Sequence, residues 1–480
     1  MIMDSLKDFV KVLEEENELK RVAVEVDANL EISEILRRTM YEKGPAILFE
    51  NVKGYDMPVL GNAFGSMKRL ELGLGMSDFT EIGERIASMT KMDMPSGIIG
   101  QIKSIPQLKK MTGSFPKPKK SGPVQDVVED EPSFAKLPIL KTWPKDAGRF
   151  ITLGLVATRH PETGTRNLGV YRMQILDDTH ALMHWQKHKR GAHHGDIAGE
   201  RGESMPAAII IGGDPATVFA GIAPVPEGLD KYLFSGITRK SGIETIPCKT
   251  IDLDVPAHAE IILEGYVDPA DVRPEGPFGD HTGYYTPPEP YPVFTLTGVT
   301  HRKNPIYLTT IVGKPILEDA YIGKVIERSF LPLMQMFHPE IIDFAMPPSG
   351  WFQGLGIISI RKRYPGQAKK VMMGLWGTGQ LSLTKIFVVV DSDIDVHDIN
   401  DVIWAITTRA DAARDTVIIN NTPTDNLDPA SPLVNLGSKM GIDATQKTAL
   451  EGFNRPIQEQ VIPDEETARM VDSRWADYKL

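Results

Sequence analysis

Short stretches of strand-forming residues follow one another closely between Val124 and Val312, separated by turn signals. The clearest pair, Ile151–Arg159 and Leu168–Leu176, flanks the turn at residues 161–164, a pattern typical of a β-hairpin. Strands this frequent favour a β-barrel or a sandwich, with one helix expected near residues 227–237. Further strands are expected at Ala207–Ile211, Thr245–Leu253, Glu260–Tyr266, Val293–Val299 and Ile306–Ile311.

The regions on either side of this strand-rich stretch show another pattern, in which helices and strands alternate. The first region predicts a small α/β unit, followed by a polar, proline-broken linker at 114–123. After Gly313 the alternation predicts a mostly parallel sheet covered by helices. Its strands are expected at 356–361, 385–391 and 416–419. A chain of 480 residues is too long for one core, so two or three domains are expected.

Composition excludes several classes of protein. The net charge of −11 argues against nucleic acid as a partner, because nucleic-acid binding needs a basic face. A single cysteine, Cys248, excludes an internal disulfide framework and a multi-cysteine zinc site. The first 20 residues lack the apolar core of a signal peptide, and no run approaches the roughly 20 apolar residues that cross a bilayer. We therefore expect a cytoplasmic protein without a transmembrane segment.

The stretch Glu275–Tyr285 concentrates chemistry in a segment that is poorly suited to regular structure. Its eleven residues hold two carboxylates, one histidine, three glycines and one proline. Such a segment is typical of a loop that places side chains on a rigid scaffold. Glu275 and Asp280 can hold different pKa values there and divide acid and base roles. The alternative is a tight surface turn with both acids in water.

A second polar concentration is Asn167–Gln174, which we expect to be a strand. Alternation places Asn167, Gly169 and Tyr171 on one face and Arg172 on the other. An arginine inside a barrel needs an anion, because an unpaired buried charge is very costly. Glu275 and Asp280 are the candidate partners, and the alternative is that Arg172 points into solvent.

The run His184–His194 is rich in histidine and in basic residues. Imidazole with oxygen ligands would suit manganese or magnesium, and the basic residues would suit a phosphate. An exposed basic loop is equally compatible with this run. The acidic run Asp391–Val396 begins like a calcium loop, but Val396 stands where that loop needs glycine. We reject calcium and expect a strand-to-helix turn there.

Taken together, these segments resemble the UbiD family of decarboxylases, which use prenylated flavin mononucleotide. The resemblance covers nearly the whole chain and is most specific in Asn167–Arg172, Glu275–Tyr285 and the late run Ala430–Gly441. It implies an α/β (α+β) fold with three domains. These are an N-terminal α/β domain (1–120), a split β-barrel flavin domain (121–315) and a C-terminal α/β domain (316–480), whose tail around Glu465–Tyr478 forms oligomers.

The resemblance also implies roles for individual residues. Arg172, Glu275 and Asp280 would form the catalytic network, with Asp280 as the proton donor. For that role Asp280 must be protonated near neutral pH, so we expect its pKa to be raised. The implied cofactor-binding residues are Val170, Tyr171, Arg172, His184, Trp185, Gln186, Lys189, Arg190 and Lys385, the last near the flavin phosphate.

Metal ligands follow from the same resemblance, with one departure. Asn167 and His188 match ligands of a divalent metal, usually manganese, and potassium is a further candidate ion. The family places a third ligand, a glutamate, at or near the position of Lys231. Glu227 lies four residues earlier and is the substitute we name, with Asp230 as another candidate. Alternatively, the Lys231 ammonium itself neutralises the phosphate.

Members of the family that act on 4-hydroxy-3-polyprenylbenzoate in quinone biosynthesis are the nearest in appearance, so we expect a decarboxylase of an aromatic carboxylic acid. One alternative is a non-aromatic α,β-unsaturated acid, such as trans-anhydromevalonate 5-phosphate, handled by archaeal relatives. Another is a flavin-binding or maturation protein without catalysis. Expected partners are a flavin prenyltransferase that supplies the cofactor and further copies of the chain, as a dimer or hexamer.

Overall fold

A nine-stranded antiparallel sheet forms the middle of the computed structural model, which describes residues 3–90, 113–187, 189–225, 229–314, 317–456 and 458–479. Its order is β6-β9-β10-β17-β14-β11-β7-β8, with β5 beside β17, so the described strands form a curved sheet that stays open between β6 and β8. The strands are β5 (Val127–Val128), β6 (Phe150–Ile151), β7 (Leu155–Arg159), β8 (Arg166–Val170), β9 (Met173–Ile175), β10 (His180–Met183), β11 (Met205–Ile211), β14 (Ile261–Glu275) and β17 (Glu289–His301). This is the expected split barrel.

The predicted hairpin around residues 161–164 is confirmed, because β7 and β8 pair antiparallel across it. The single strand predicted over Leu168–Leu176 is wrong. β8 ends at Val170 and pairs with β7, whereas β9 pairs with β6 and β10 in another part of the sheet. Arg172 lies in the break between the two strands, so strand alternation does not decide where its side chain points.

Three helices accompany this sheet, and the polar residue before two of them caps the first turn. Asp214 accepts hydrogen bonds from two backbone N–H groups of α7, and Asp230 does the same for α8. The helices are α6 (Arg190–Glu200), α7 (Pro215–Ile222) and α8 (Lys231–Arg239).

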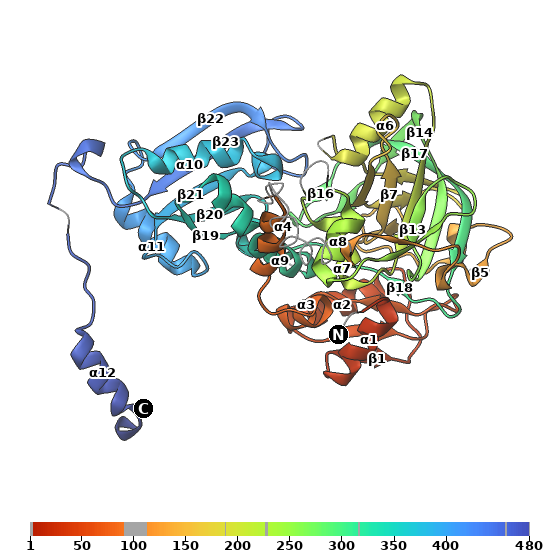
Figure 1. Cartoon of the computed structure of the whole chain (residues 1–480), viewed down its shortest axis with the longest axis horizontal. Coiled ribbons are helices and arrows are strands. Elements are labelled where there is room, and N and C mark those ends of the chain that lie inside the picture. Colours follow the sequence, from red (N-terminus) through yellow and green to blue (C-terminus); the bar gives the residue numbers. More distant parts are fainter. Residues whose placement is uncertain are drawn as a thin grey trace, which may run out of the picture.

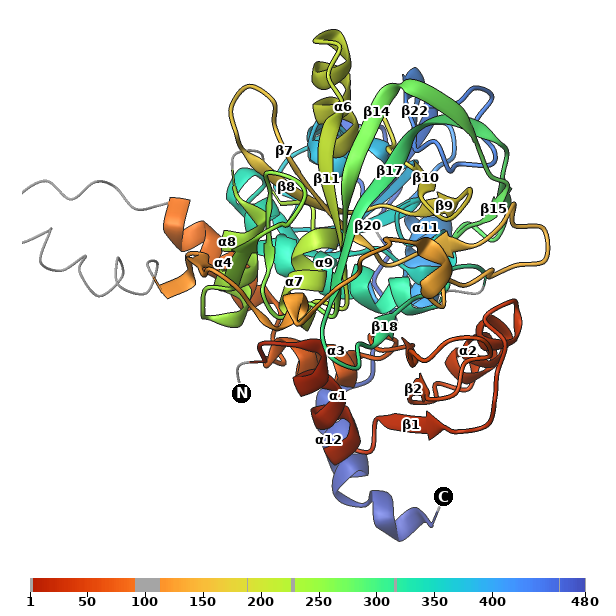
Figure 2. The same ribbon diagram turned by 90° about the vertical axis from the view of Figure 1, so that its right-hand side faces the viewer.

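The N-terminal region forms a four-stranded sheet in the order β1-β2-β3-β18, with helices around it (Figure 2). The first helix begins after Ser5, which forms a reciprocal capping box with Asp8. One hydrophobic core runs from Met3 to Val325, so this region and the middle sheet share their interior. The elements are α1 (Leu6–Glu15), β1 (Leu19–Val22), α2 (Glu31–Tyr41), β2 (Ala46–Phe49), β3 (Val59–Gly61), α3 (Met67–Leu74), α4 (Thr80–Thr90) and β18 (Tyr307–Leu308). The predicted domain boundaries remain predictions.

The segment 114–123 is more than the expected linker. Residues Lys117–Pro118 form β4, which pairs parallel with β12 (Glu244–Pro247). β12 also pairs with β13 (Asp254–Pro256), so a small three-stranded sheet holds this part of the chain. The strand expected over Thr245–Leu253 is wrong beyond Pro247, because β12 ends there and the chain turns back into β13 at Asp254.

The C-terminal region is a five-stranded sheet in the order β19-β20-β21-β23-β22. Its inner pairs are parallel and its two edge pairs antiparallel, so the sheet is mixed. Alternate residues of β20 and β21 face opposite sides, where α10 and α11 bury separate clusters. The elements are α9 (Glu318–Phe337), β19 (Ile341–Ala345), β20 (Leu355–Ile360), α10 (Gln367–Trp376), β21 (Ile386–Asp391), α11 (Ile399–Arg409), β22 (Thr416–Pro423) and β23 (Leu436–Ala444).

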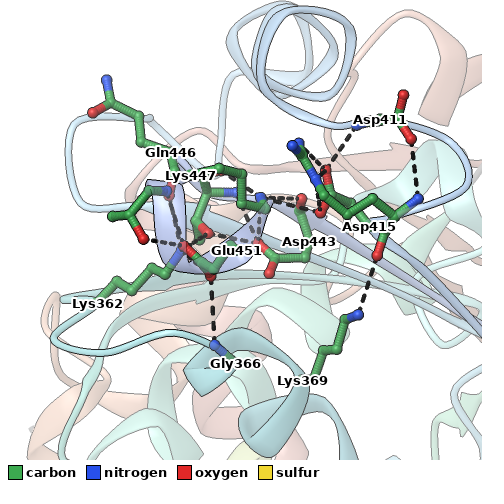
Figure 3. Close-up of polar contacts among 12 residues, drawn as sticks. Lys362, Gly366, Lys369, Asp411, Asp415, Asp443, Gln446, Lys447 and Glu451 are labelled. Carbon is green, nitrogen blue, oxygen red and sulfur yellow. Dashed lines mark hydrogen bonds and ion pairs between the residues drawn. The ribbon is translucent and has the colours of Figure 1, made fainter. Parts of the chain in front are cut away.

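A buried polar network closes one end of this sheet (Figure 3). Lys447 donates to the carbonyl oxygen of Asp443 at 2.8 Å and to its carboxylate at 3.0 Å. Lys362 pairs with Glu451 at 2.7 Å. The strand-to-helix turn expected over Asp391–Val396 is confirmed, because it joins β21 to α11, and Asp391 and Asp393 both accept hydrogen bonds from Arg409 of α11.

The tail leaves the body of the molecule and ends in α12 (Glu465–Ser473), well away from the C-terminal sheet (Figure 1). Its apolar side chains are in water, with Met470 44% and Trp475 57% exposed. In the part of the chain that the structure describes, no helix combines the length and the apolar character needed to cross a membrane.

Candidate active site

The stretch Glu275–Tyr285 is a tight hairpin whose acids point inward. Glu275 ends β14, and β15 (Phe278–Gly279) pairs with β16 (Tyr285–Thr286). The backbone N–H of Asp280 donates to Tyr284 O at 3.0 Å, and Gly283 takes a φ of 82° that favours glycine. Glu275 is fully buried and Asp280 is 6% exposed. The alternative of a surface turn with solvated acids is therefore wrong.

Arg172 joins both acids. Its Nε and Nη2 donate to the two oxygens of Glu275 at 2.7 and 3.0 Å, while Nη1 donates to Asp280 Oδ2. The guanidinium lies over the Phe278 ring, 4.6 Å from its centroid, and Nη2 also reaches Thr286 Oγ1 at 3.1 Å. The expected contact between Arg172 and the two carboxylates is confirmed, and the alternative of an arginine in solvent is wrong.

Both carboxyl groups of this network have a pKa below the ordinary value. Burial opposes ionisation of Glu275, but hydrogen bonds from His184 and Arg172 lower its pKa to about 2. Burial also opposes ionisation of Asp280, yet the hydrogen bond from His281 and the charge of Arg172 hold its pKa well below the usual range. The expectation of a raised pKa for Asp280 is wrong for this arrangement, because His281 and Arg172 outweigh the effect of burial.

The aromatic residues expected at the cofactor lie beside the network. His184 Nδ1 is 3.0 Å from Glu275 Oε2, and its ring centroid is 4.3 Å from that of Tyr291. Trp185 packs edge-on to Tyr171, whose hydroxyl accepts from the backbone N–H of Gly191 at 3.1 Å. Buried atoms without a partner among the described residues include His184 Nε2, Trp185 Nε1 and Asn167 Nδ2. Unpartnered buried polar atoms are costly, so these three indicate a ligand.

Three cations gather near these residues. Burial, together with the charges of Arg190 and Lys189, lowers the pKa of the Lys231 ammonium to about 7. Lys231 Nζ donates to Gly221 O at 2.9 Å, and Arg190 Nη2 donates to Val225 O at 2.6 Å. Within the described ranges, no carboxylate forms an ion pair with Arg190 or Lys231. A group of three cations, of which Arg190 and Lys231 have no carboxylate partner among the described residues, is suited to an anion such as a flavin phosphate.

The remaining cofactor-binding expectations are spread over two domains. Val170 is half-buried at the end of β8. Gln186 Nε2 donates to Asn426 Oδ1 of the C-terminal region at 2.8 Å. Lys385 pairs with Asp428 at 2.9 Å, so its charge is already engaged within the C-terminal region.

The metal site stays a prediction. Asn167 is buried on β8 and lines a small cavity with Lys231. His188 and Glu227 lie outside the described residues, and among the residues that are described no three His, Cys, Asp or Glu side chains gather to hold a metal. A buried ammonium beside Asn167 does not suit a metal cation.

The sequence did not single out several residues of the site. His281 lies within Glu275–Tyr285, and its position next to Asp280 is a local signal for a place in the site. Thr286, Tyr291 and Asp319 gave no local signal, because only the tertiary fold brings β16, β17 and the first turn of α9 to the same place.

Comparisons with known proteins agree with this geometry. Three models of 3-octaprenyl-4-hydroxybenzoate carboxy-lyase match: its N-terminal domain over residues 10–86, its Rift-related domain over 116–315 and its C-terminal domain over 320–444. An uncharacterized protein of Archaeoglobus fulgidus is 51% identical to this chain over 480 residues. The match covers 100% of this chain and 99% of the archaeal protein.

Solved structures give the same result. Vanillic acid decarboxylase of Sedimentibacter hydroxybenzoicus, in a closed form, is 28% identical with a TM-score of 0.87, and the match covers 99% of each chain. The UbiD-class enzyme HmfF of Pelotomaculum thermopropionicum, in complex with FMN, is 29% identical with a TM-score of 0.80 over 98% of this chain and 99% of that one. The chain belongs to the UbiD family of carboxy-lyases.

Proposed function

We propose that the chain decarboxylates an acid whose carboxyl group is attached to an sp² carbon, reversibly and without oxidation, and that Arg172, Glu275 and Asp280 are its catalytic residues. The observation that carries this proposal is the buried arginine that binds both carboxylates. The unpartnered nitrogens of His184, Trp185 and Asn167 and the cations Lys189, Arg190 and Lys231 support a prenylated FMN as the cofactor.

Loss of CO2 from such an acid leaves an electron pair that no side chain delocalises, and the prenylated flavin supplies that electron sink when bound. Arg172 keeps Glu275 ionised and attracts the substrate carboxylate. Asp280 delivers the proton that replaces CO2, and its partners His281 and Arg172 hold it in place. A positioned acid of this kind typically contributes about 10²–10⁴-fold to the rate.

Two substrate classes follow, each from its own observation. The matched family models carry the name of a polyprenylated hydroxybenzoate, and vanillic acid decarboxylase is structurally similar, which favours an aromatic acid such as a quinone precursor. The basic residues Lys187, Lys189, Arg190 and Lys231 favour the alternative, a phosphorylated, non-aromatic unsaturated acid, because their positive charge suits a substrate phosphate beside that of the flavin. A flavin-binding protein without catalysis is set aside, because all three domains match a carboxy-lyase.

We also propose that a flavin prenyltransferase supplies the cofactor and that the exposed tail joins copies of the chain. The apolar side chains of α12 support the second point, because they have nothing to bury against within the described part of one chain. An evolved form of the related enzyme HmfF is dimeric.

Asp280→Asn tests the site. We expect the variant to keep its cofactor, seen in the absorption spectrum, and to lose CO2 release. Ordinary turnover by the fully loaded variant would contradict the role of Asp280. Comparing benzoates with phosphorylated unsaturated aliphatic acids as substrates of the wild-type protein separates the two substrate classes.

A further inference from the structure

Each turnover consumes one proton, because the substrate carboxylate leaves as CO2 and the carbon keeps the bonding electron pair. Asp280 is 6% exposed and its two oxygens are occupied by Arg172 and His281. Bulk water therefore has little direct access to Asp280. A neighbouring group has to restore its proton after every cycle.

His281 is placed to do so. Its Nδ1 lies 2.9 Å from Asp280 Oδ1, and its backbone N–H donates to the same oxygen at 2.8 Å. The rings of Trp351 and Phe352, from the C-terminal region, cover the imidazole with centroids 5.9 and 5.3 Å away. On the other side of the ring, Nε2 is buried and has no partner among the described residues.

Asp319 complements this orphan nitrogen. It lies in the first turn of α9, and its Oδ1 is likewise buried without a partner in the described part of the chain. Asp319 and His281 interact electrostatically, so one orphan donor and one orphan acceptor are found in the same neighbourhood. The other charged groups that act on His281 are Asp280 and Asp425.

The charges favour a proton stored on the imidazole. Burial disfavours the imidazolium, but the hydrogen bond and charge of Asp280, followed by the charges of Asp319 and Asp425, raise the pKa of His281 above its usual value. Burial raises the pKa of Asp319 to about 6, although His281 opposes the rise. The resting pair is thus an Asp280 carboxylate and a His281 imidazolium.

We propose that His281 and Asp319 form a proton relay that reloads Asp280. This inference rests on the proposed function. The proton on His281 Nδ1 passes to Asp280 Oδ1, and Asp280 then delivers it to the substrate carbon in place of CO2. Loss of the Nδ1 proton leaves a neutral imidazole that still carries its hydrogen on Nε2. The ring turns to present its bare nitrogen to the Asp319 carboxyl, accepts a proton from it and turns back, and Asp319 regains a proton from water. One solvent proton enters the product, and no electrons change hands. His281 and Asp319 act through Asp280 and are positioning residues.

Two substitutions test the relay. His281→Asn keeps an N–H donor for Asp280 Oδ1 but carries no transferable proton, and Asp319→Asn keeps the shape of the side chain. Glu318→Gln is the matched control. Glu318 is buried on the same turn of α9, with a pKa raised by burial to about 7, but its oxygens bind Phe64 N and Thr310 Oγ1.

The readout separates CO2 chemistry from proton delivery. Exchange of ¹³CO2 into the substrate precedes protonation, whereas deuterium from D2O enters the product only through it. In cofactor-loaded protein, both relay variants are expected to keep ¹³CO2 exchange within about twofold and to lose deuterium incorporation at least about a hundredfold, the lower end for a lost acid-base group. Glu318→Gln is expected to change neither rate.

Equal loss of both rates in the two relay variants indicates a structural role and overturns the relay. Unchanged deuterium incorporation in both variants also overturns it. If the wild-type protein shows no ¹³CO2 exchange with any candidate acid, the proposed function itself fails, and the relay fails with it. Asp319 belongs to α9 and not to the hairpin that holds His281. The Asp319→Asn variant therefore tests the relay even if the His281→Asn variant does not fold.

Discussion

Replacing Arg172 by methionine removes the charge that the two buried carboxylates share and keeps a side chain of similar length over Phe278. Four hydrogen bonds disappear, two of them to Glu275. In the variant, Glu275 keeps its hydrogen bond with His184, and Asp280 keeps its hydrogen bond with His281. We therefore expect the unfolding free energy at pH 7 to fall by about 3 kcal/mol, the low end of the range for breaking a buried ion pair.

The pH dependence makes this prediction specific. In the wild-type protein the pKa of Glu275 is lowered from 4.5 to about 2, so its contribution to stability is complete above pH 4.5 and is lost as the pH falls toward 2. Without Arg172, burial raises that pKa again. The stability difference between wild type and Arg172→Met is therefore largest at neutral pH and shrinks below pH 4.5.

Urea unfolding at pH 7 and at pH 4, followed by tryptophan fluorescence, measures this difference. The double variant Arg172→Met/Glu275→Gln is the control, because it removes the negative charge of Glu275 together with the positive charge of Arg172. We expect it to recover part of the lost stability at pH 7. A destabilisation that is equal at both pH values and unrelieved in the double variant would refute the reasoning.

The remaining predictions concern the cofactor, the tail and the first helix. Lys231→Met should weaken FMN binding by about tenfold to a hundredfold, as expected for a lost charge-assisted hydrogen bond, without affecting riboflavin; the exposed Lys187→Met should change neither, and fluorescence titration decides. Ending the chain at Pro463 should lower the molar mass measured by light scattering, and an unchanged mass would exclude the tail from assembly. Ser5→Ala should cost about 1 kcal/mol of unfolding free energy through loss of the cap, checked by thermal unfolding.

Much of the secondary structure could be predicted from local sequence patterns. The hairpin at residues 161–164 has a turn sequence between two strand patterns, and the helix after Ser5 has both a cap and helical spacing of apolar residues. The pairing of strands that are distant in the sequence could not be predicted in this way. The sequence of β8 and β9 has the pattern of a single strand, because no local feature marks the break at Tyr171 and Arg172. At this break the chain passes from the part of the sheet that contains β7 to the part that contains β6.

The site likewise has features that the sequence predicts and features that depend on the tertiary fold. Arg172, Glu275 and Asp280 were predicted as a group because a buried arginine needs anions and the acids lie in an irregular segment. The ionisation of Asp280 was predicted wrongly, since the sequence showed burial and Glu275 as causes but not the closeness of His281 and Arg172. Asp319 is 38 positions after His281, and only the packing of α9 against the hairpin brings them together.

Release of CO2 from a candidate acid, by protein produced with and without a flavin prenyltransferase, tests the central claim most directly. We expect CO2 release only from protein that carries the prenylated flavin, which its mass and absorption spectrum identify. Equal CO2 release from protein without that cofactor would contradict the account, as would a protein that takes up no flavin under these conditions.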